Sequence, residues 1–207
     1  QGGLGWYRKT FTLPSSMSDK KISIEFDGVY MDSYIYLNGQ LLGNHAYGYT
    51  GFSFDLTGLV YTDDVTPNVI AVKVQNQLPS SRWYSGSGIY RNVRLIVTDD
   101  IHVKRWGTFI TTPSLENTIQ DDYADVHVKT DVANEGQETK TVDLVSRIID
   151  ADGNIVAQTT SNAILDVQDY TNEDDIRVDN PTLWSFGNPY LYTLESDLVV
   201  KGNVVDT

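Results

Sequence analysis

The sequence has 207 residues, of which 40% are hydrophobic, and its formal net charge is −13. That length is enough for one large β domain or two ordinary ones with sound cores. The excess of carboxylates argues against a nucleic-acid partner, because phosphate binding needs clustered Lys and Arg side chains. The absence of cysteine excludes disulfides and thiolate metal sites, and it leaves localisation open between the bacterial cytoplasm and the secreted or cell-surface space.

Helical periodicity is almost absent, and no run of about 18 apolar residues suggests a membrane span. The first part of the chain instead alternates apolar and polar residues in short runs, which is typical of strands in a β-sandwich. Asn38-Gly39 separates two such runs and predicts a tight hairpin, because a type I′ turn needs positive φ at both central residues. The expected strands are 6–13, 21–26, 33–37, 51–55, 69–74 and 90–97.

The alternating pattern breaks near residues 111–114, and a polar stretch follows from 116 to 122. We therefore predict a first domain over residues 1–112 and a second over 113–207. The second set of short runs suits an immunoglobulin-like sandwich. Because the chain opens almost on a strand and stops just after a turn-like segment at 201–203, we expect the first domain to lack its N-terminal strand and the second to be truncated.

A loop with large planar side chains lies between the strand-like runs 69–74 and 90–97. It reads Ser81-Arg82-Trp83-Tyr84-Ser85-Gly86-Ser87-Gly88. Trp and Tyr present flat apolar faces with a polar tip, and Arg offers a planar fork of donors, so these residues are equipped to hold a hydroxylated ring. The other interpretation is that the rings fill a core or contact a partner.

A second aromatic and glycine segment contains Tyr47, Tyr49 and Phe52, and it is a candidate to border the Arg82 loop. Its alternative role is packing against a neighbouring domain. Asp27 is the most site-like carboxylate, but we expect it to be a buried partner for a strand arginine such as Arg91.

Other chemistry finds no support in the sequence. The three histidines lie far apart, without a second ligand at metal spacing, so we assign no metal site. No nucleophile elbow and no pair of carboxylates suited to glycosidase chemistry stands out, so we assign no catalytic residue. No nicotinamide, flavin or phosphate motif occurs, and no cofactor is evident.

Four segments of the first part, taken in order and spacing, resemble the amino-terminal part of glycoside hydrolase family 2. Two later segments resemble the end of that family's second domain. The six segments are Gly2-Gly3-Leu4-Gly5-Trp6-Tyr7-Arg8-Lys9-Thr10-Phe11, Phe26-Asp27-Gly28-Val29-Tyr30-Met31-Asp32-Ser33, Leu37-Asn38-Gly39-Gln40-Leu41-Leu42-Gly43, Ser81 to Val93, Asn180-Pro181-Thr182-Leu183-Trp184-Ser185 and Asn188-Pro189-Tyr190-Leu191-Tyr192.

The resemblance implies an all-β chain with a jelly-roll sugar-binding sandwich followed by an immunoglobulin-like sandwich. In the family a TIM barrel follows and carries the acid/base and nucleophile glutamates, and that barrel is absent here. The resemblance further implies a retaining, exo-acting parent enzyme, of the β-galactosidase type. Its partner would be a terminal β-galactoside, bound in a pocket shared with the barrel, and a homo-oligomer is allowed. Arg82 would donate hydrogen bonds to sugar hydroxyls, with Trp83 and Tyr84 packed beside it.

Three alternatives stay open at this point. The parent could act on glucuronides, mannosides or fucose-bearing substrates instead of galactosides. The chain could be a stand-alone carbohydrate-binding or adhesive module, which would bind sugar without chemistry. The two domains could also serve only to buttress the barrel and build a subunit interface.

Overall fold

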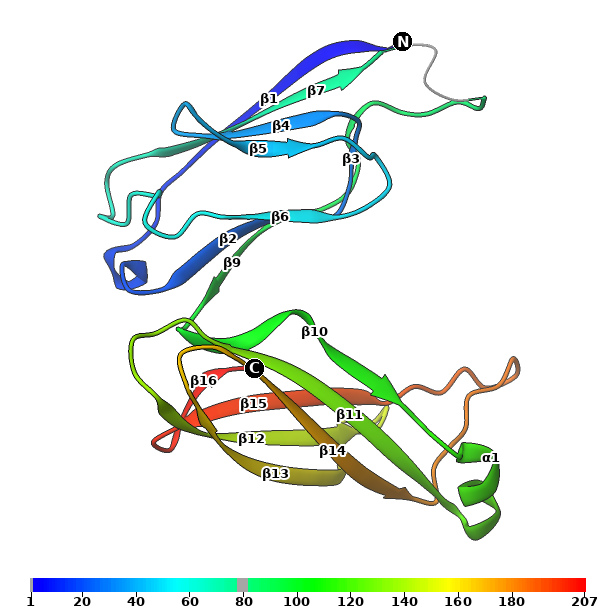
Figure 1. The fold of residues 1–207 in the computed structure, drawn as a ribbon. Coiled ribbons are helices and arrows are strands. Elements are labelled where there is room, and N and C mark those ends of the chain that lie inside the picture. The colour runs from blue at the N-terminus through cyan, green and yellow to red at the C-terminus, as the bar shows by residue number, and fades with distance from the viewer. Residues whose placement is uncertain (1, 78–81) are drawn as a thin grey trace. The chain divides into compact units, whose positions relative to one another are not determined.

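The computed structural model describes residues 2–77 and 82–207 (Figure 1). The chain divides into two compact β units, Gln1–Val97 and Thr98–Thr207. The predicted fold class, a jelly-roll sandwich followed by an immunoglobulin-like sandwich, is confirmed. No helix in the described ranges is long and apolar enough to cross a membrane.

The first unit contains two facing sheets and a short two-stranded ribbon (Figure 1). One sheet has the strand order β1-β7-β4-β5, the other has the order β6-β2-β9, and β3 pairs with β8. The elements are β1 (Gly3–Phe11), η1 (Ser15–Met17), β2 (Lys21–Phe26), β3 (Val29–Tyr30), β4 (Ser33–Leu37), β5 (Gln40–His45), β6 (Phe52–Asp55), β7 (Asn68–Asn76), β8 (Gly88–Ile89) and β9 (Val93–Thr98).

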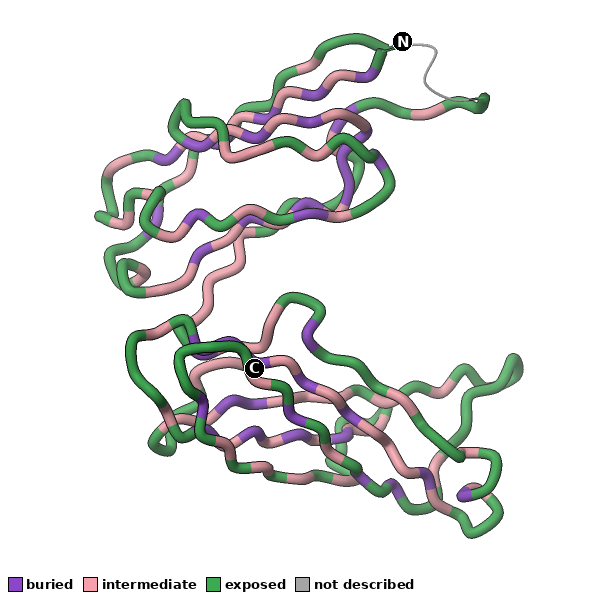
Figure 2. The backbone as a smooth tube through the Cα atoms, in the orientation of Figure 1, coloured by how far each residue is buried: buried purple, intermediate pink, exposed green. Residues whose placement is uncertain are grey.

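The alternation in the sequence becomes alternation of burial along the strands (Figure 2). Every second residue of β2 and of β7 is buried, because successive side chains of a strand point to opposite faces. The buried side chains of the two sheets meet in one apolar core, which includes Phe26, Ile35 and Val72. Burial of this shared face holds the two layers together.

The hairpin predicted at Asn38-Gly39 is confirmed. Asn38 has φ 50° and Gly39 has φ 86°, and the turn joins β4 to β5 with Leu37 opposite Gln40. The Asn38 side chain also accepts a hydrogen bond from the backbone N–H of Val69 at 2.8 Å. This bond ties the turn to β7, the strand that leads into the Arg82 loop.

The second unit is also a two-layer sandwich, with sheets β10-β11-β14 and β13-β12-β15-β16. Its apolar residues gather in two clusters, one around Leu198 and one around Val128. The elements are β10 (Ile101–Thr111), α1 (Leu115–Thr118), η2 (Ile119–Asp121), β11 (Tyr123–Asn134), β12 (Lys140–Ile149), β13 (Ile155–Leu165), β14 (Asp169–Asp179), β15 (Thr193–Val200) and β16 (Asn203–Asp206).

The division between the units lies earlier in the chain than the boundary drawn after residue 112. Strand β10 pairs with β11, from Ile101 opposite Asn134 to Thr111 opposite His127, so it belongs to the second unit. The break in the pattern near residues 111–114 marks the end of β10 and the start of α1. A polar interruption inside a domain therefore has the same appearance in the sequence as a linker.

Candidate functional site

The loop between β7 and β8 presents its large side chains to solvent. Arg82, Trp83 and Tyr84 are all exposed, with 66% of Trp83 and 89% of Tyr84 accessible. Ser81, the first residue of the predicted loop, lies outside the described residues. Exposed rings beside a cation are available to a ligand rather than used in the core of this unit.

The second aromatic segment does border this loop. The indole N–H of Trp83 donates a hydrogen bond to the hydroxyl oxygen of Tyr49, with 3.3 Å between Nε1 and Oη. The Tyr49 ring lies edge-on to Tyr30, with 5.3 Å between centroids, and edge-on to Tyr47 at 5.6 Å. Tyr30 is 5% exposed, so this cluster connects the loop to the interior of the unit.

Phe52 does not join that cluster as a site residue. It is buried, and its ring stacks on Phe26 at 4.9 Å and on His45 at 4.3 Å. Phe52 is the first residue of β6, and its side chain belongs to the apolar core of the first unit. Of the three aromatic residues in the segment that was a candidate to border the Arg82 loop, Phe52 therefore belongs to the core.

Two glycines allow this packing. A Cβ on Gly48 would lie 2.3 Å from Cδ2 of Tyr30, and a Cβ on Gly28 would lie 2.6 Å from Cζ of Tyr90. The Tyr90 hydroxyl donates a hydrogen bond to the carbonyl oxygen of Gly48 at 2.8 Å. Residues 47–49 are therefore held by rings from β3 and from the segment after β8.

We expect Gly48→Ala to destabilise the first unit by about 1–3 kcal/mol, because the new methyl group must displace a buried ring. Gly86→Ala is the matched control, since a Cβ there meets no atom within 4 Å. Urea denaturation of the chain, followed by circular dichroism, measures both free energies of unfolding. Equal stability of the two variants would contradict the packing described for Gly48.

Polar contacts hold the end of the Arg82 loop that leads into β8. Asn76, which is 1% exposed, donates from Nδ2 to Oγ of Ser87 at 2.6 Å. Its Oδ1 is buried and has no hydrogen-bond partner among the described residues. Next to it, Nε2 of Gln75 donates to the Asp32 carboxylate at 3.0 Å. The last residues of β7 thus make polar contacts with Ser87 of the loop and with Asp32.

The predicted pairing of Asp27 takes a different partner. Asp27 accepts a hydrogen bond from Nη1 of Arg94 at 2.7 Å, and this bond, together with the carboxylate charge, raises the pKa of Arg94. Arg91 lies over the ring of Tyr90, with 5.9 Å between Cζ and the centroid. Asp27 follows the last residue of β2 and Arg94 lies near the start of β9, so this ion pair joins two neighbouring strands.

The three histidines occupy separate structural positions. His45 contacts Thr50 at 3.0 Å, His102 contacts the backbone oxygen of Asp99 at 3.0 Å, and His127 contacts Asp175 at 2.9 Å. Within residues 2–77 and 82–207, no group of three or more His, Asp or Glu side chains could hold a metal ion.

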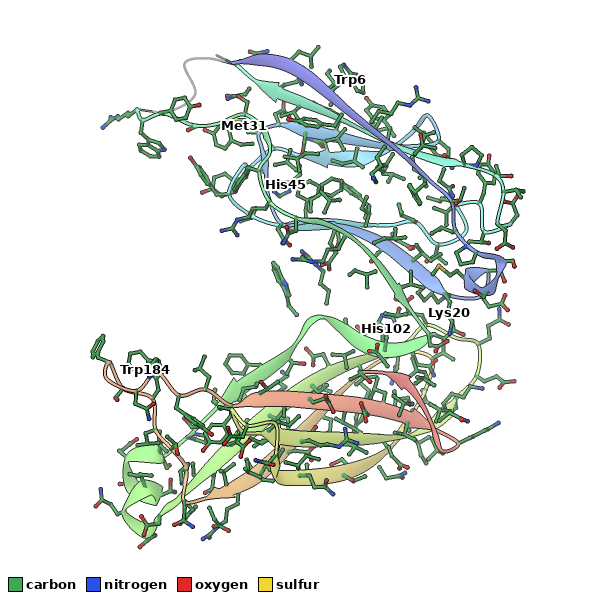
Figure 3. The ribbon with its side chains drawn as sticks, turned by 180° about the vertical axis from the view of Figure 1, so that it is seen from behind. Trp6, Lys20, Met31, His45, His102 and Trp184 are labelled. Carbon is green, nitrogen blue, oxygen red and sulfur yellow. The ribbon has the colours of Figure 1, made fainter. Side chains whose placement is uncertain are left out.

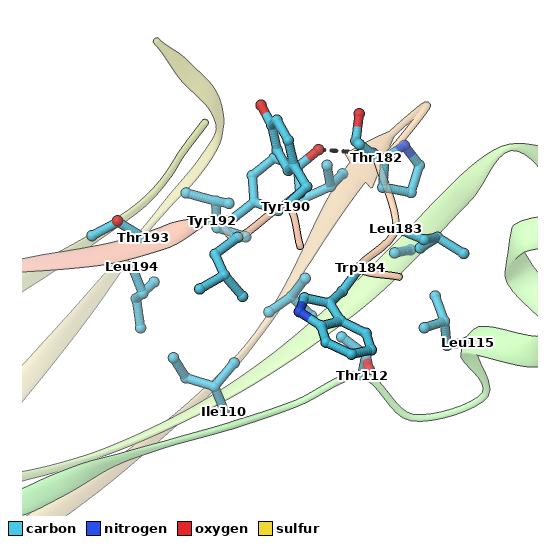
Figure 4. A pocket seen from close by; sticks show the side chains of 16 residues that line it. Ile110, Thr112, Leu115, Thr182, Leu183, Trp184, Tyr190, Tyr192, Thr193 and Leu194 are labelled. Carbon is cyan, nitrogen blue, oxygen red and sulfur yellow. Dashed lines mark hydrogen bonds between the residues drawn. The ribbon is translucent and has the colours of Figure 1, made fainter. Parts of the chain in front are cut away.

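A cavity of about 250 Å³ in the second unit was missed in the sequence (Figure 4). Trp184, Tyr190 and Tyr192 line it together with aliphatic residues of β10, β11, β12, β14 and β15. The hydroxyl of Tyr192 accepts the backbone N–H of Thr182 at 2.9 Å, and that of Tyr190 accepts the N–H of Ala151 at 3.2 Å. These two hydroxyls serve the backbone, so the cavity suits a polyhydroxylated ligand less well than the Arg82 loop does.

The sequence does contain the aromatic residues of this cavity, in two segments around Trp184 and Tyr190 that are rich in proline and aromatic side chains. Trp184 lies on the loop before β15 (Figure 3), where its ring meets Phe186 edge-on at 5.2 Å. Which strands enclose these rings depends on the topology of the sandwich. Sequence spacing alone does not contain that information.

Comparison with known families assigns both units of the chain to one family. The family model described as "Glycosyl hydrolases family 2, sugar binding domain" matches residues 1–99, and the one described as "Glycosyl hydrolases family 2" matches residues 102–207. Among curated proteins, Beta-galactosidase BoGH2A of Bacteroides ovatus is 42% identical over 99% of this chain and 24% of its own length. A "Putative beta-glucuronidase" of Formosa agariphila is 35% identical over 99% of this chain and 19% of its own length.

Solved structures give the same result. A glycosyl hydrolase family 2 member from Bacteroides cellulosilyticus aligns with a TM-score of 0.94 and 40% identity, over 100% of this chain and 28% of its own. A beta-glucuronidase from glycoside hydrolase family 2 aligns with a TM-score of 0.92 and 32% identity, over 100% of this chain and 23% of its own. The chain therefore spans about a quarter or less of the two curated relatives named above.

Proposed function

Because this chain belongs to glycoside hydrolase family 2, we propose that it is the non-catalytic amino-terminal portion of a retaining, exo-acting β-galactosidase. In this proposal Arg82, Trp83 and Tyr84 help to form the pocket for a terminal, non-reducing β-galactoside. The 42% identity to a protein named as a beta-galactosidase favours that sugar.

The observation that carries the proposal is the hydrogen bond from Trp83 to Tyr49. It keeps an aromatic ring at the surface of the unit whose family model is described as sugar binding. Arg82 precedes Trp83 and Tyr84 follows it, and all three are exposed. A guanidinium donates several hydrogen bonds to hydroxyl oxygens, and the rings cover the apolar C–H face of a sugar.

The reaction itself needs groups that we assign to the rest of the parent protein. A retaining glycosidase uses two carboxyl groups roughly 5 Å apart, one as acid/base and one as nucleophile. The residues of this chain would orient the sugar ring relative to those carboxyl groups and exclude water from its outer face. Such contacts lower the barrier to the extent that they strengthen in the transition state.

A second candidate activity is β-glucuronidase, because relatives and solved structures with that name match over the whole chain. A glucuronide adds a carboxylate that a cation would read, and Arg82 is such a cation. The two candidate activities therefore differ in the sugar that the Arg82 loop would bind, a β-galactoside or a β-glucuronide.

We expect the purified parent to hydrolyse an aryl β-galactoside faster than an aryl β-glucuronide, and the isolated 207-residue chain to hydrolyse neither. Release of the aryl chromophore measures both rates, and isothermal titration with galactose measures binding to the isolated chain. Turnover by the isolated chain would contradict its non-catalytic role. A preference for the glucuronide would replace the galactosidase assignment, and tight galactose binding without a catalytic parent would favour a stand-alone binding module.

A further inference from the structure

We propose that Tyr49 is a positioning residue whose hydroxyl sets the orientation of the Trp83 indole in the sugar site. The proposal rests on the function proposed above and deepens it by adding a residue from a separate segment of the chain. Tyr49 lies between β5 and β6, and Trp83 lies between β7 and β8, so the hydrogen bond joins two loops that are 34 residues apart.

The position of Tyr49 is determined by its neighbours. Its ring packs edge-on against Tyr30, which is 5% exposed and lies on β3. Gly48 lets the Tyr30 ring approach the backbone closely, and the Tyr90 hydroxyl holds the Gly48 carbonyl oxygen. The Tyr49 hydroxyl is thus presented from a well-packed support, whereas the loop that contains Trp83 is rich in glycine and serine.

The Trp83 loop needs such a support. Ser85, Gly86 and Ser87 follow the aromatic pair, and a chain of this composition samples many conformations. The bond from Asn76 to Ser87 holds one end of the described segment, and the bond from Trp83 to Tyr49 holds the other. Fixing the loop before the sugar arrives reduces the conformational entropy lost on binding.

A double-mutant cycle in the parent protein tests this coupling. Tyr49→Phe keeps the ring and removes only the hydroxyl, and Trp83→Phe removes the indole N–H donor. We expect Tyr49→Phe to lower kcat/KM for an aryl β-galactoside by about threefold to tenfold, the value of one hydrogen bond, mainly through KM. In the Trp83→Phe background the same change should have no further effect.

Tyr61→Phe is the matched control. Tyr61 is 50% exposed and Tyr49 is 48% exposed, and both belong to the first unit. Tyr61 precedes β7, while the Trp83 loop follows that strand. We expect Tyr61→Phe to leave kcat/KM and KM unchanged.

A spectroscopic measurement separates the positioning role from the sugar-binding role. The 207-residue chain has four tryptophans, so labelling with 5-fluorotryptophan gives four ¹⁹F signals, and Trp83→Phe identifies one of them. We expect Tyr49→Phe to shift the Trp83 signal alone.

An unmoved Trp83 signal, or equal losses of kcat/KM from Tyr49→Phe in both backgrounds, would overturn the inference. If that signal moves while Arg82→Ala and Trp83→Phe leave kcat/KM unchanged, Tyr49 still orients Trp83 and it is the proposed function of the loop that fails.

Discussion

We expect Phe26→Ala to lower the free energy of unfolding of the first unit by about 3–5 kcal/mol, the range for removal of a large ring from a packed core. Phe26 is 1% exposed and lies on β2, the central strand of its sheet. Its ring stacks on Phe52 with 12° between the planes. Phe52 begins β6, directly after the segment that carries Tyr49, so the cavity left by Phe26 should also loosen that support.

Chemical denaturation of the chain measures this loss. Phe109→Ala is the control, because Phe109 is 62% exposed, and we expect it to change stability by less than about 0.5 kcal/mol. If Phe26→Ala costs no more than Phe109→Ala, the assignment of Phe26 to the core is incorrect.

The parts of the fold that were predicted from the sequence depend on local signals. Alternation along β2 and β7 predicts their buried faces because the side-chain period of a strand is two. The Asn38-Gly39 turn was found because few residues other than Asn and Gly accept its backbone geometry. The aromatic loop stands out by its residue types alone, and the structure adds that its rings are exposed and not part of the core.

The parts that could not be predicted depend on register and topology. Asp27 pairs with Arg94, which lies within β9, whereas Arg91 precedes that strand and lies over the ring of Tyr90. The sequence places both arginines in the same run, 90–97, and the pairing of β2 with β9 is what brings Arg94 to Asp27. The same limit applies to the apolar cavity around Trp184, which is lined by residues of five strands from distant parts of the second unit.

The hydrogen bond between Tyr49 and Trp83 is an intermediate case. Composition made the second aromatic segment a candidate neighbour of the Arg82 loop, with packing against another domain as the alternative, and it gave no partner for either ring. The contact follows from the short ribbon of β3 and β8, which brings Tyr30 opposite Gly88. The residue types of the candidate site can therefore be recognised in short stretches of sequence. Their arrangement depends on contacts between segments that are far apart in the chain.

We expect Arg82→Ala in the parent protein to raise KM and to lower kcat/KM for an aryl β-galactoside by about tenfold or more, as for a lost hydrogen bond to a charged donor. Arg82 is exposed and precedes Trp83, which is hydrogen-bonded to Tyr49, so removal of the Arg82 side chain should not disturb the core. The melting temperature of the variant should therefore stay close to that of the wild type.

Two further variants define the contribution of the guanidinium. Arg82→Lys keeps the charge but loses the planar fork of donors, so it should recover only part of the activity. Arg8→Ala removes an exposed arginine from β1 of the same unit, and we expect it to leave the kinetics unchanged.

The most direct test of the central claim is kcat/KM of the wild-type parent and of its Arg82→Ala variant, measured side by side on an aryl β-galactoside. If the loop forms part of the sugar pocket, the variant retains about a tenth or less of the wild-type value while its melting temperature is unchanged. Equal values of kcat/KM would remove Arg82 from the site and contradict the role assigned to the loop.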